Sequence, residues 1–560
     1  MAVLEKSKLF ASRKFNSYLT SANTNGQEKW LGYFFCPMGA AILNVTIISY
    51  LNVFYTDVLD LTNSFKWAAA FLTLFPILSK VVDAITNIIM GQIIEKTRTK
   101  QGKARPWIFI SAPLMTASCI LLFLIPQKHS IIQLILVVLT YNLFFSFAYT
   151  IYNMSHTLMV PLSTNNVKQR DGLSLFTNMG VNMLPGVVVS LVFPAVLMPI
   201  LGYSYQKWLT AMTIIAAIAL PFTMLEYFFT KERVTEAAME AGETETISFK
   251  EQLKACFGSK YWVMMILFML MFQIMSNIMT VSLPYFCNWV LGTYNDGTTQ
   301  TILSAVGKAP LGFGVFLLWP LIKKFGKRKV MIIGFTIAAL AEILCWIGRV
   351  NMPVMLVGSA VYAIGFLPSY VYSALMADTL DYVEYKSHIR ADGLTASIFT
   401  IIATISVGIS QSIFNLGLST TNYQPPQLIS EGVYNTQSAA TQNFISFAYI
   451  GIPGIALAIM ALIMVFLRVE DMLPEINAEL TARRKAEAEA RGEVYLSIEE
   501  KAALEQEEND RIAEENRIAE LKAKCKKKGL DFDTEEAKYQ EKLADKKAKE
   551  EAKAAKKNKK

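Results

Sequence analysis

Long apolar segments follow one another through most of the chain and restrict the folds open to it. A helix that crosses a membrane needs roughly 20 mainly apolar residues. The bilayer interior offers no water to exposed backbone groups, so such segments fold there as helices. Breaks rich in charge, Gly or Pro separate most of them. We predict twelve spans, over residues 30–55, 65–93, 107–126, 131–160, 173–201, 207–229, 261–290, 300–322, 330–348, 353–377, 394–417 and 443–467.

Composition and charge placement agree with a membrane protein. Hydrophobic residues make up 53% of the chain and charged residues only 18%, which is too apolar for a soluble protein of this length. From Arg468 onward charged residues dominate. The net charge of +8 does not indicate nucleic-acid binding, because Lys and Arg gather in short loops and at the C-terminus, as at a cytoplasmic membrane face.

Motifs of enzymes and ATP-driven pumps do not occur in the sequence. There is no glycine-rich phosphate loop followed by Lys-Ser/Thr, so ATP is not the expected energy source. HExxH and GxSxG do not occur either, and the six cysteines show no CxxC pair or metal-ligand spacing. We therefore expect neither an enzyme nor a cofactor. The polar residues 1–28 lack the apolar core of a signal peptide, so we expect the first span to direct insertion.

The basic loops predict the topology. The two richest in Lys and Arg follow spans 2 and 8, and the segment 419–442 has none. Basic loops stay in the cytoplasm, so we expect a multi-pass protein of the cell (cytoplasmic) membrane with both termini cytoplasmic. Spans 2 and 8 are equivalent positions in a six-plus-six arrangement, which is typical of two parallel six-helix halves built from inverted repeats.

The predicted fold class is therefore an all-α membrane protein, with twelve transmembrane helices in two six-helix halves and a charged cytoplasmic helical tail. Its tail is rich in Ala, Glu and Lys, which favour helix. We expect a solvated or partly disordered helix there; docking of a cytoplasmic partner, or contact with anionic lipid, are the alternatives. The predicted parts are a cytoplasmic segment 1–28, an N-terminal half 29–229, a central cytoplasmic loop 230–260, a C-terminal half 261–468 and the tail 469–560.

Span 2 carries two charges inside its apolar run. Lys80 and Asp83 are three residues apart and therefore share a helix face, on which Thr86 and Asn87 also lie. Intramembrane charge is costly, so such residues are candidate functional groups. The oxygens suit a hard cation such as Na⁺, and Asp83 alone suits a proton. The alternative is a structural Lys80–Asp83 pair that closes the helix bundle.

Three stretches of sequence resemble one transporter family. Residues 55–107 contain YTDV, DAIT, MG, a TR pair and RPW; residues 148–173 contain AYTIYNMSHTLMVP and QRDGL; residues 377–394 read ADTLDYVEYKSHIRADGL. In order and spacing these resemble the glycoside–pentoside–hexuronide:cation symporter family. The resemblance implies a major facilitator fold, with the substrate held between the halves near the bilayer midplane.

The resemblance also implies roles for individual residues. Lys80 and Asp83 match the family's basic and first acidic positions on helix 2. Its second acidic position is Asn87 here, while Thr86 and Thr150 match further ligands on the cation side. The implied cation site is thus Asp83, Thr86, Asn87 and Thr150, and it binds Na⁺ or H⁺.

Around the sugar, the sequence departs from the family pattern. The helix 1 acid is replaced by Ala41, the helix 4 acid by Asn153, the helix 5 Arg by Asn178 and the helix 11 Lys by Thr404. Removing one member of a buried ion pair strands the other, whereas removing acids and bases together leaves a tolerable neutral pocket. Amides and hydroxyls can still bind the hydroxyl groups of a sugar. The predicted substrate-binding residues are Tyr149, Tyr152, Asn153, Asn178, Gln273, Asn277 and Thr404.

Some polar residues keep two interpretations. Gln273 and Asn277 on helix 7 either face the solute or bond to neighbouring helices. Lys308 either binds an anionic solute or extends to the outer headgroups. His156 is either a satisfied core histidine or a proton relay.

Charged residues near the cytoplasmic ends of the spans resemble the gating groups of major facilitators. The loop GQIIEKTRTKQGK contains Glu95 and Arg98, and KKFGKRK after span 8 resembles a second copy. Salt bridges between such groups could close the cytoplasmic side, and a plain role in topology is the alternative. The predicted gating residues are Lys80, Glu95, Arg98, Asp378, Asp381, Glu384 and Arg390.

The function predicted from these features is secondary active transport of a glycoside or oligosaccharide by alternating access, coupled to Na⁺ or H⁺. Its expected partners are the solute, membrane lipids and a cytoplasmic protein at the tail. One alternative is a carrier or facilitator for a non-sugar solute such as an amphiphile. The other is a transport-inactive receptor that acts through its tail.

Overall fold

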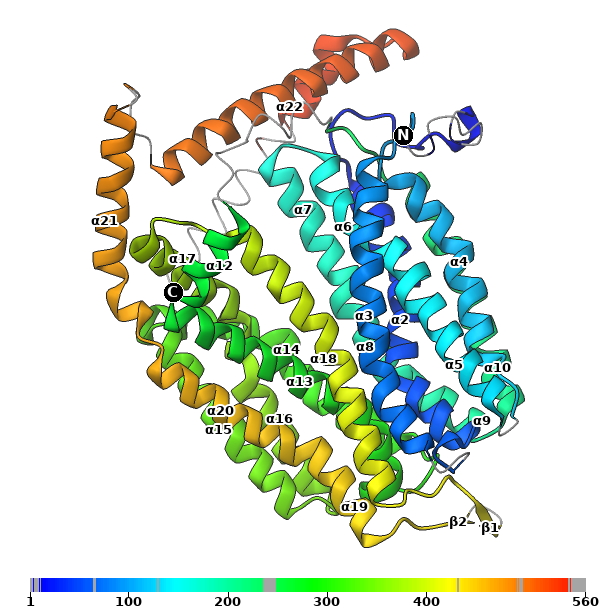
Figure 1. The fold of residues 1–560 in the computed structure, drawn as a ribbon. Coiled ribbons are helices and arrows are strands. Elements are labelled where there is room, and N and C mark those ends of the chain that lie inside the picture. The colour runs from blue at the N-terminus through cyan, green and yellow to red at the C-terminus, as the bar shows by residue number, and fades with distance from the viewer. Residues whose placement is uncertain are drawn as a thin grey trace.

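Helices form nearly all of the structure, a computed structural model that describes residues 4, 10, 12–63, 67–127, 130–234, 248–430, 433–490, 492, 497–541 and 544. In this part of the chain the strands are β1 (Leu428–Ser430) and β2 (Val433–Tyr434), which pair antiparallel. We call the end of the molecule with this pair the hairpin face (Figure 1). The opposite end, where the N-terminal segment and α22 (Ile498–Lys528) lie, is the terminal face.

The first set of membrane helices is built from the N-terminal two-fifths of the chain. Several of its spans are continuous helices in which α-helical and π-helical (η) turns alternate, and short 3-10 turns η1 (Arg13–Phe15) and η4 (Leu61–Asn63) lie outside them. In chain order the elements are η2 (Glu28–Phe35), α2 (Cys36–Val53), η3 (Phe54–Val58), α3 (Ala68–Glu95), α4 (Arg105–Phe123), α5 (Ile131–Asn142), η5 (Leu143–Tyr149), α6 (Thr150–Ser163), α7 (Val167–Thr177), η6 (Asn178–Met183), α8 (Leu184–Val192), η7 (Phe193–Leu197), α9 (Met198–Leu201) and α10 (Tyr205–Phe228).

The second set follows an amphipathic helix, α12 (Phe249–Phe257), and precedes the tail helices α21 (Val469–Ala490) and α22. Its elements are α13 (Lys260–Phe286), η8 (Cys287–Leu291), α14 (Thr298–Phe325), α15 (Lys327–Ile347), α16 (Met352–Phe366), η9 (Leu367–Val371), α17 (Tyr372–Ser387), α18 (Asp392–Thr420), α19 (Ala439–Ser446), η10 (Phe447–Gly451) and α20 (Ile452–Phe466).

Eleven helices among the described residues are long and apolar enough to cross a membrane. The helix α14 lies where the eighth span was predicted, at 300–322. The all-α, multi-span fold class is therefore confirmed. Some spans are longer than predicted: the tenth runs from Met352 to Ser387 rather than ending at 377, because the helix continues through the acidic residues beyond its apolar part. The predicted part boundaries stay predictions, and residues 235–247 of the predicted central loop lie outside the described residues.

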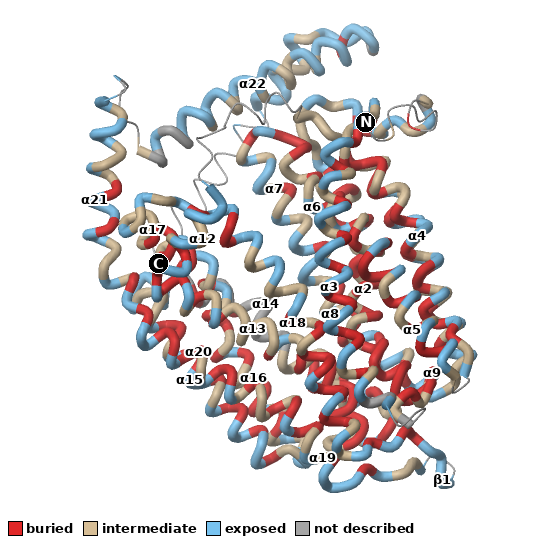
Figure 2. Tube along the Cα trace, in the orientation of Figure 1, coloured by how far each residue is buried: buried red, intermediate tan, exposed pale blue. Residues whose placement is uncertain are grey.

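Burial shows which surfaces meet lipid and which meet protein. Buried residues lie on the inward faces of the helices, and exposed ones on the outside (Figure 2). The exposed side chains include large apolar ones, such as Ile88, Ile132 and Ile347. Apolar outer faces of this kind are stable in hydrocarbon and not in water, so the structure fits a multi-pass membrane protein.

The two sets of helices share a core near the hairpin face. One apolar cluster unites helices of the first set with the hairpin-side ends of α13 and α18, for example Tyr285 and Phe414; a second cluster lies wholly within the second set, α12 and α21. In Figure 1 the two sets lie closest near this face and diverge toward the terminal face. The packing therefore closes the hairpin face.

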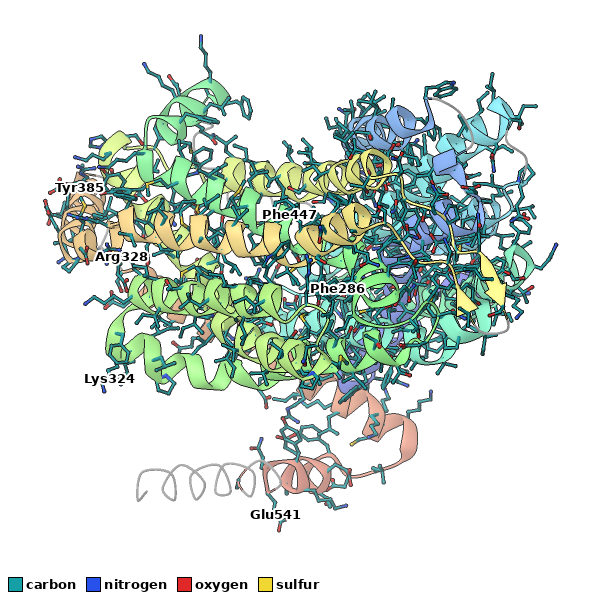
Figure 3. All side chains as sticks on the ribbon, turned by 90° about the horizontal axis from the view of Figure 1, so that it is seen from below. Phe286, Lys324, Arg328, Tyr385, Phe447 and Glu541 are labelled. Atoms are coloured by element: carbon teal, nitrogen blue, oxygen red, sulfur yellow. The ribbon has the colours of Figure 1, made fainter. Side chains whose placement is uncertain are left out.

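The tail helices α21 and α22 contact different sets of membrane helices. In α21, Arg484 binds Glu384 at 2.9 Å and Glu475 accepts a hydrogen bond from Tyr385 at 3.3 Å. Figure 3 shows Tyr385 and Arg328 beside α21 at the far end of the second set. In α22, Asp510 pairs with Lys168 of α7 at 2.5 Å.

Candidate functional site

The charged pair of span 2 lies inside the molecule. Lys80 Nζ donates to Asp83 Oδ2 at 2.6 Å, and the two residues are 6% and 5% exposed. The second carboxylate oxygen of Asp83 accepts a hydrogen bond from the Ser146 hydroxyl on η5. Ser146 Oγ also lies 3.0 Å from Asn142 Oδ1. Both oxygens of Asp83 are therefore bound to donors, as a buried carboxylate requires.

Aromatic rings and a helix of the second set enclose the Lys80 side chain. Its Nζ lies 5.1 Å from the ring centroid of Phe145 and 5.7 Å from that of Tyr141, within the range of cation–π attraction. The Tyr141 hydroxyl lies 3.5 Å from Gln411 Oε1 on α18. A Cβ added to Gly408 of α18 would lie 2.9 Å from Lys80 Cγ, so the close crossing of α3 and α18 depends on this glycine. The pair is thus part of the contact between the two sets.

The other predicted cation ligands lie near Asp83 with their hydroxyl protons engaged. Thr86 donates to the Val82 carbonyl at 3.0 Å, and Thr150 donates to the Phe145 carbonyl at 3.1 Å. Asn87 is half-buried. Hydroxyl oxygens keep free lone pairs after donating, so these groups can still face a cation. No cluster of three His, Cys, Asp or Glu side chains suited to a metal ion occurs in the part of the chain that the structure describes.

The sequence interpretation missed Ser146, which binds Asp83, and Asn142, which lies beside Ser146. Asn142, Ser146 and Thr150 follow one another at intervals of four residues within an apolar span. Such spacing places side chains on one helix face, so this pattern was a signal that could have identified them.

Two of the predicted solute-binding residues share a hollow in the first set. Asn153 and Asn178 line a cavity of about 310 Å³ together with Asn182, whose side chain donates to Asn178 Oδ1 at 2.8 Å. Asn153 and Asn178 are both exposed. The helices that line this hollow, α6, α7 and η6, all belong to the first set. It offers amide groups to a polar ligand, and no Asp, Glu, Lys or Arg is among the residues that line it.

Tyr152 lies behind this hollow rather than in it. Its buried hydroxyl donates to Glu226 Oε2 at 2.8 Å, and His156 Nδ1 lies 2.6 Å from Glu226 Oε1. Tyr149, half-buried, has its ring centroid 6.2 Å from that of Tyr152. The sequence interpretation also missed Glu226. As a single acid within the apolar stretch of α10, it could have been identified as a candidate functional residue. The Tyr152 hydroxyl is thus engaged by Glu226 in this structure, and its contact with a solute stays a prediction.

The remaining predicted solute residues belong to the second set and lie apart from the hollow. Asn277 donates to the Gln273 carbonyl at 2.7 Å along α13, and Thr404 donates to the Thr400 carbonyl at 2.9 Å along α18. The helices α13 and α18 pack against each other. The predicted substrate residues are therefore divided between the two sets of helices. The side chain of Lys308 lies outside the described residues.

A network at the hairpin face joins the two sets. Asp57 on η3 accepts hydrogen bonds from Tyr423 at 2.7 Å and from Tyr294 at 3.2 Å. The neighbouring Thr56 hydroxyl lies 2.7 Å from the hydroxyl of Tyr285, which also accepts from Asn52 at 2.9 Å. These contacts cross from the first set to the second, so they hold the hairpin face closed.

The predicted gating residues at the terminal face form pairs within each set. Arg390 binds Asp381 at 2.8 Å and Glu384 at 2.9 Å, and Asp378 binds Lys327 at 2.5 Å. In the first set, Glu95 pairs with Lys103 at 2.9 Å and its carbonyl accepts from Arg98 at 2.7 Å. Each of these pairs joins residues of one set, unlike the network at the hairpin face.

Comparison with known proteins agrees with this architecture. Residues 32–471 match the family described as MFS/sugar transport protein. The isoprimeverose transporter of Lactiplantibacillus pentosus is 26% identical over 460 residues, covering 80% of this chain and 90% of that protein. The glucuronide carrier protein homolog of Escherichia coli (strain K12) is 25% identical over 420 residues, covering 72% and 86%.

Solved structures show the same fold at low sequence identity. The D-xylose-proton symporter aligns with a TM-score of 0.51 at 16% identity, over 76% of this chain and 95% of that one. The nucleoside transporter NupG aligns with a TM-score of 0.51 at 11% identity, over 79% and 98%. These confirm the major facilitator fold. The chain is a transporter rather than an enzyme, and it belongs to the MFS/sugar transport family of glycoside–pentoside–hexuronide:cation symporters.

Proposed function

We propose that this protein moves a glycoside or oligosaccharide across the cytoplasmic membrane by alternating access, with the terminal face in the cytoplasm. The main support is the hollow lined by Asn153 and Asn178, together with family membership over residues 32–471. Neutral amides offer both donors and acceptors, which sugar hydroxyls require. An anionic or cationic solute would lack a fixed counter-charge there.

The described arrangement is the inward-facing state of this cycle. The hairpin face is closed by Asp57 and its tyrosine partners, while the gating pairs at the terminal face stay within their own sets. In the opposite state the Asp57 contacts separate and the terminal face closes, with Glu95, Arg98 and the acidic end of α17 facing one another. Such rocking of two rigid halves is the usual motion of this architecture.

A coupling cation would act at the Lys80–Asp83 pair. Each carboxylate oxygen of Asp83 has one donor here and keeps a further lone pair, so a cation can bind beside Ser146 and Lys80 or displace one of them. Thr86, Asn87 and Thr150 would then complete its coordination with neutral oxygens. Displacement of Lys80 would loosen the contact with Tyr141 and α18, and this connects ion binding to the interface between the halves.

The test is a saccharide screen by thermal unfolding of the purified protein, with and without Na⁺. A ligand that binds only the folded state at 100 times its Kd adds about 2.7 kcal/mol of stability. We expect a saccharide to stabilise the protein, and Asn153→Ala to weaken its binding about tenfold through the lost hydrogen bonds. Thr213→Val, on α10 outside the hollow, is the matched control. If no saccharide stabilises the protein, the proposal is wrong.

A further inference from the structure

Five acidic side chains among the described residues are buried, and one of them differs from the others. Glu28, Asp57, Asp83 and Glu226 each have a hydrogen-bond partner, at 2.8, 2.7, 2.6 and 2.8 Å respectively. Glu342 on α15 is 5% exposed, and none of the described residues donates a hydrogen bond to it or pairs with it. An unpartnered buried acid in a membrane helix is costly and is therefore a candidate functional group.

Glu342 lies at a cavity of about 480 Å³ between the two sets of helices. The second set provides most of the wall, including Cys345, Tyr362 and Tyr449 around the acid. The helix α20 packs closely against Glu342, because a Cβ added to Gly454 would lie 3.2 Å from Glu342 Cβ. The first set provides the facing wall, from α2 and from the η6–α8 segment: Val45, Ser49, Tyr50, Asn182, Gly186, Val189 and Ser190.

The surroundings of Glu342 favour its neutral form. Among the described side chains, the titratable groups that face the cavity are Cys345 on its own helix, Tyr362 on α16, Tyr449 on η10 and Tyr50 on α2. Thiols and phenols are uncharged near neutral pH, so no cation in this set offsets a carboxylate. Burying an ionised carboxylate without a partner costs far more than burying the protonated acid. Without a partner, Glu342 is therefore more stable at this site as a carboxylic acid than as a carboxylate.

We propose that Glu342 is a proton-binding site whose affinity changes between the two states of the carrier. With the hairpin face closed, the walls from both sets keep the cavity narrow and Glu342 holds a proton. When the sets separate at that face, the wall formed by α2 and α8 moves away and water reaches the carboxyl. The acid then releases its proton as H⁺ and becomes a hydrated carboxylate. Proton binding and the conformational equilibrium are thereby linked.

The proton site itself is tested without any solute. Infrared spectroscopy of the membrane-reconstituted protein detects the carbonyl stretch of protonated carboxyls at neutral pH. We expect Glu342→Gln to lose one carboxyl's share of this band, Glu342→Asp to retain it, and Cys345→Ser, in the same cavity, to leave it unchanged. Thermal unfolding confirms that each variant is folded. An undiminished band in folded Glu342→Gln protein overturns the proposal.

The link to solute movement rests on the proposed function and has its own measurement. When isoprimeverose, the sugar named for one relative, is added outside weakly buffered vesicles, proton-coupled entry makes the medium alkaline. We expect wild-type vesicles to give this signal and Glu342→Gln vesicles to lose it while still exchanging labelled sugar. Retention of the full signal by the variant overturns the linkage. Failure of wild-type vesicles to move any saccharide refutes the proposed function instead, and the infrared result still decides the proton site.

Discussion

Asp83 and Glu342 are buried to the same degree, at 5% exposed each, but in opposite surroundings. Asp83 has an ammonium partner and a hydroxyl donor. Glu342 lies in a cavity between the two sets with no donor among the described residues. The comparison shows that burial alone does not determine the state of an acid; its partners do. The first acid is suited to ion pairing and the second to carrying a proton.

The largest expected effect comes from neutralising one acid at a time. Asp83→Asn leaves Lys80 as an uncompensated buried charge, and we expect a loss of about 3–5 kcal/mol of stability together with the loss of any cation dependence of transport. Glu342→Gln replaces one neutral side chain by another, so its stability should change by less than about 1 kcal/mol. Unfolding of the two variants in matched detergent measures the difference. Equal losses would contradict the comparison, and coupled uptake that continues unchanged in Asp83→Asn would remove the cation assignment.

A second prediction concerns the wall against which Lys80 packs. Gly408→Ala would place a Cβ 2.9 Å from Lys80 Cγ and from the Pro76 carbonyl oxygen. Such overpacking typically costs 1–3 kcal/mol, so we expect about 2 kcal/mol here. Gly393→Ala on the same helix is the matched control, because a Cβ there meets no atom within 4 Å. Equal stability of the two variants would show that α3 and α18 can separate without cost.

Closure of the hairpin face can be weakened without a substitution at Asp83 or Glu342. Tyr423→Phe removes one donor to Asp57, and we expect a shift of about 1–2 kcal/mol toward the open state. The shift is read from faster reaction of a thiol reagent, added from that face, with Ser49→Cys in the cavity wall. Tyr434→Phe, whose ring packs 4.8 Å from that of Tyr294, is the control. A rate that does not increase in Tyr423→Phe would mean that Asp57 does not hold this face closed.

The smallest expected effect lies at the tail. Hydrogen bonds from Lys168 and Asn166 lower the pKa of Asp510, so this contact is present above the usual carboxyl pKa of about 3.9 and is lost as pH falls through the lowered value. Exposed ion pairs contribute at most about 1 kcal/mol, so Lys168→Ala should raise protease cleavage of the tail by about fivefold at most. Arg511→Ala, whose pairing with Glu508 stays within α22, is the control. If the rate of tail cleavage changes neither with pH nor in Lys168→Ala, α22 does not bind α7 through this ion pair.

Sequence periodicity was sufficient to predict the fold but not the contacts between residues on different helices of the site. Apolar segments of sufficient length predict spans directly, because the bilayer leaves the backbone few choices. The three-residue spacing of Lys80 and Asp83 also predicted their shared face, and the structure pairs them. Contacts such as Ser146 with Asp83, or Tyr423 with Asp57, join residues far apart in sequence, so spacing within one helix could not reveal them.

Glu342 went unnoticed for a different reason. It stands in an apolar helix without a motif, and no spacing rule connects it to Cys345, Tyr362 and Tyr449 together. Its significance comes from having no hydrogen-bond or ion-pair partner among the described residues, which only the packed structure can show. Tyr152 gained a partner that the sequence did not suggest: its hydroxyl binds Glu226, and its predicted contact with a solute stays a prediction.

Counterflow tests the central claim most directly, because it requires a binding site that alternates between the two sides of the membrane. Vesicles containing the purified protein and loaded with an unlabelled saccharide are diluted into a trace of the same labelled compound. Isoprimeverose and any saccharide that stabilises the protein are the probes. We predict transient accumulation of label, retained in Glu342→Gln and weakened in Asn153→Ala. Binding without accumulation of label would contradict transport and favour a receptor.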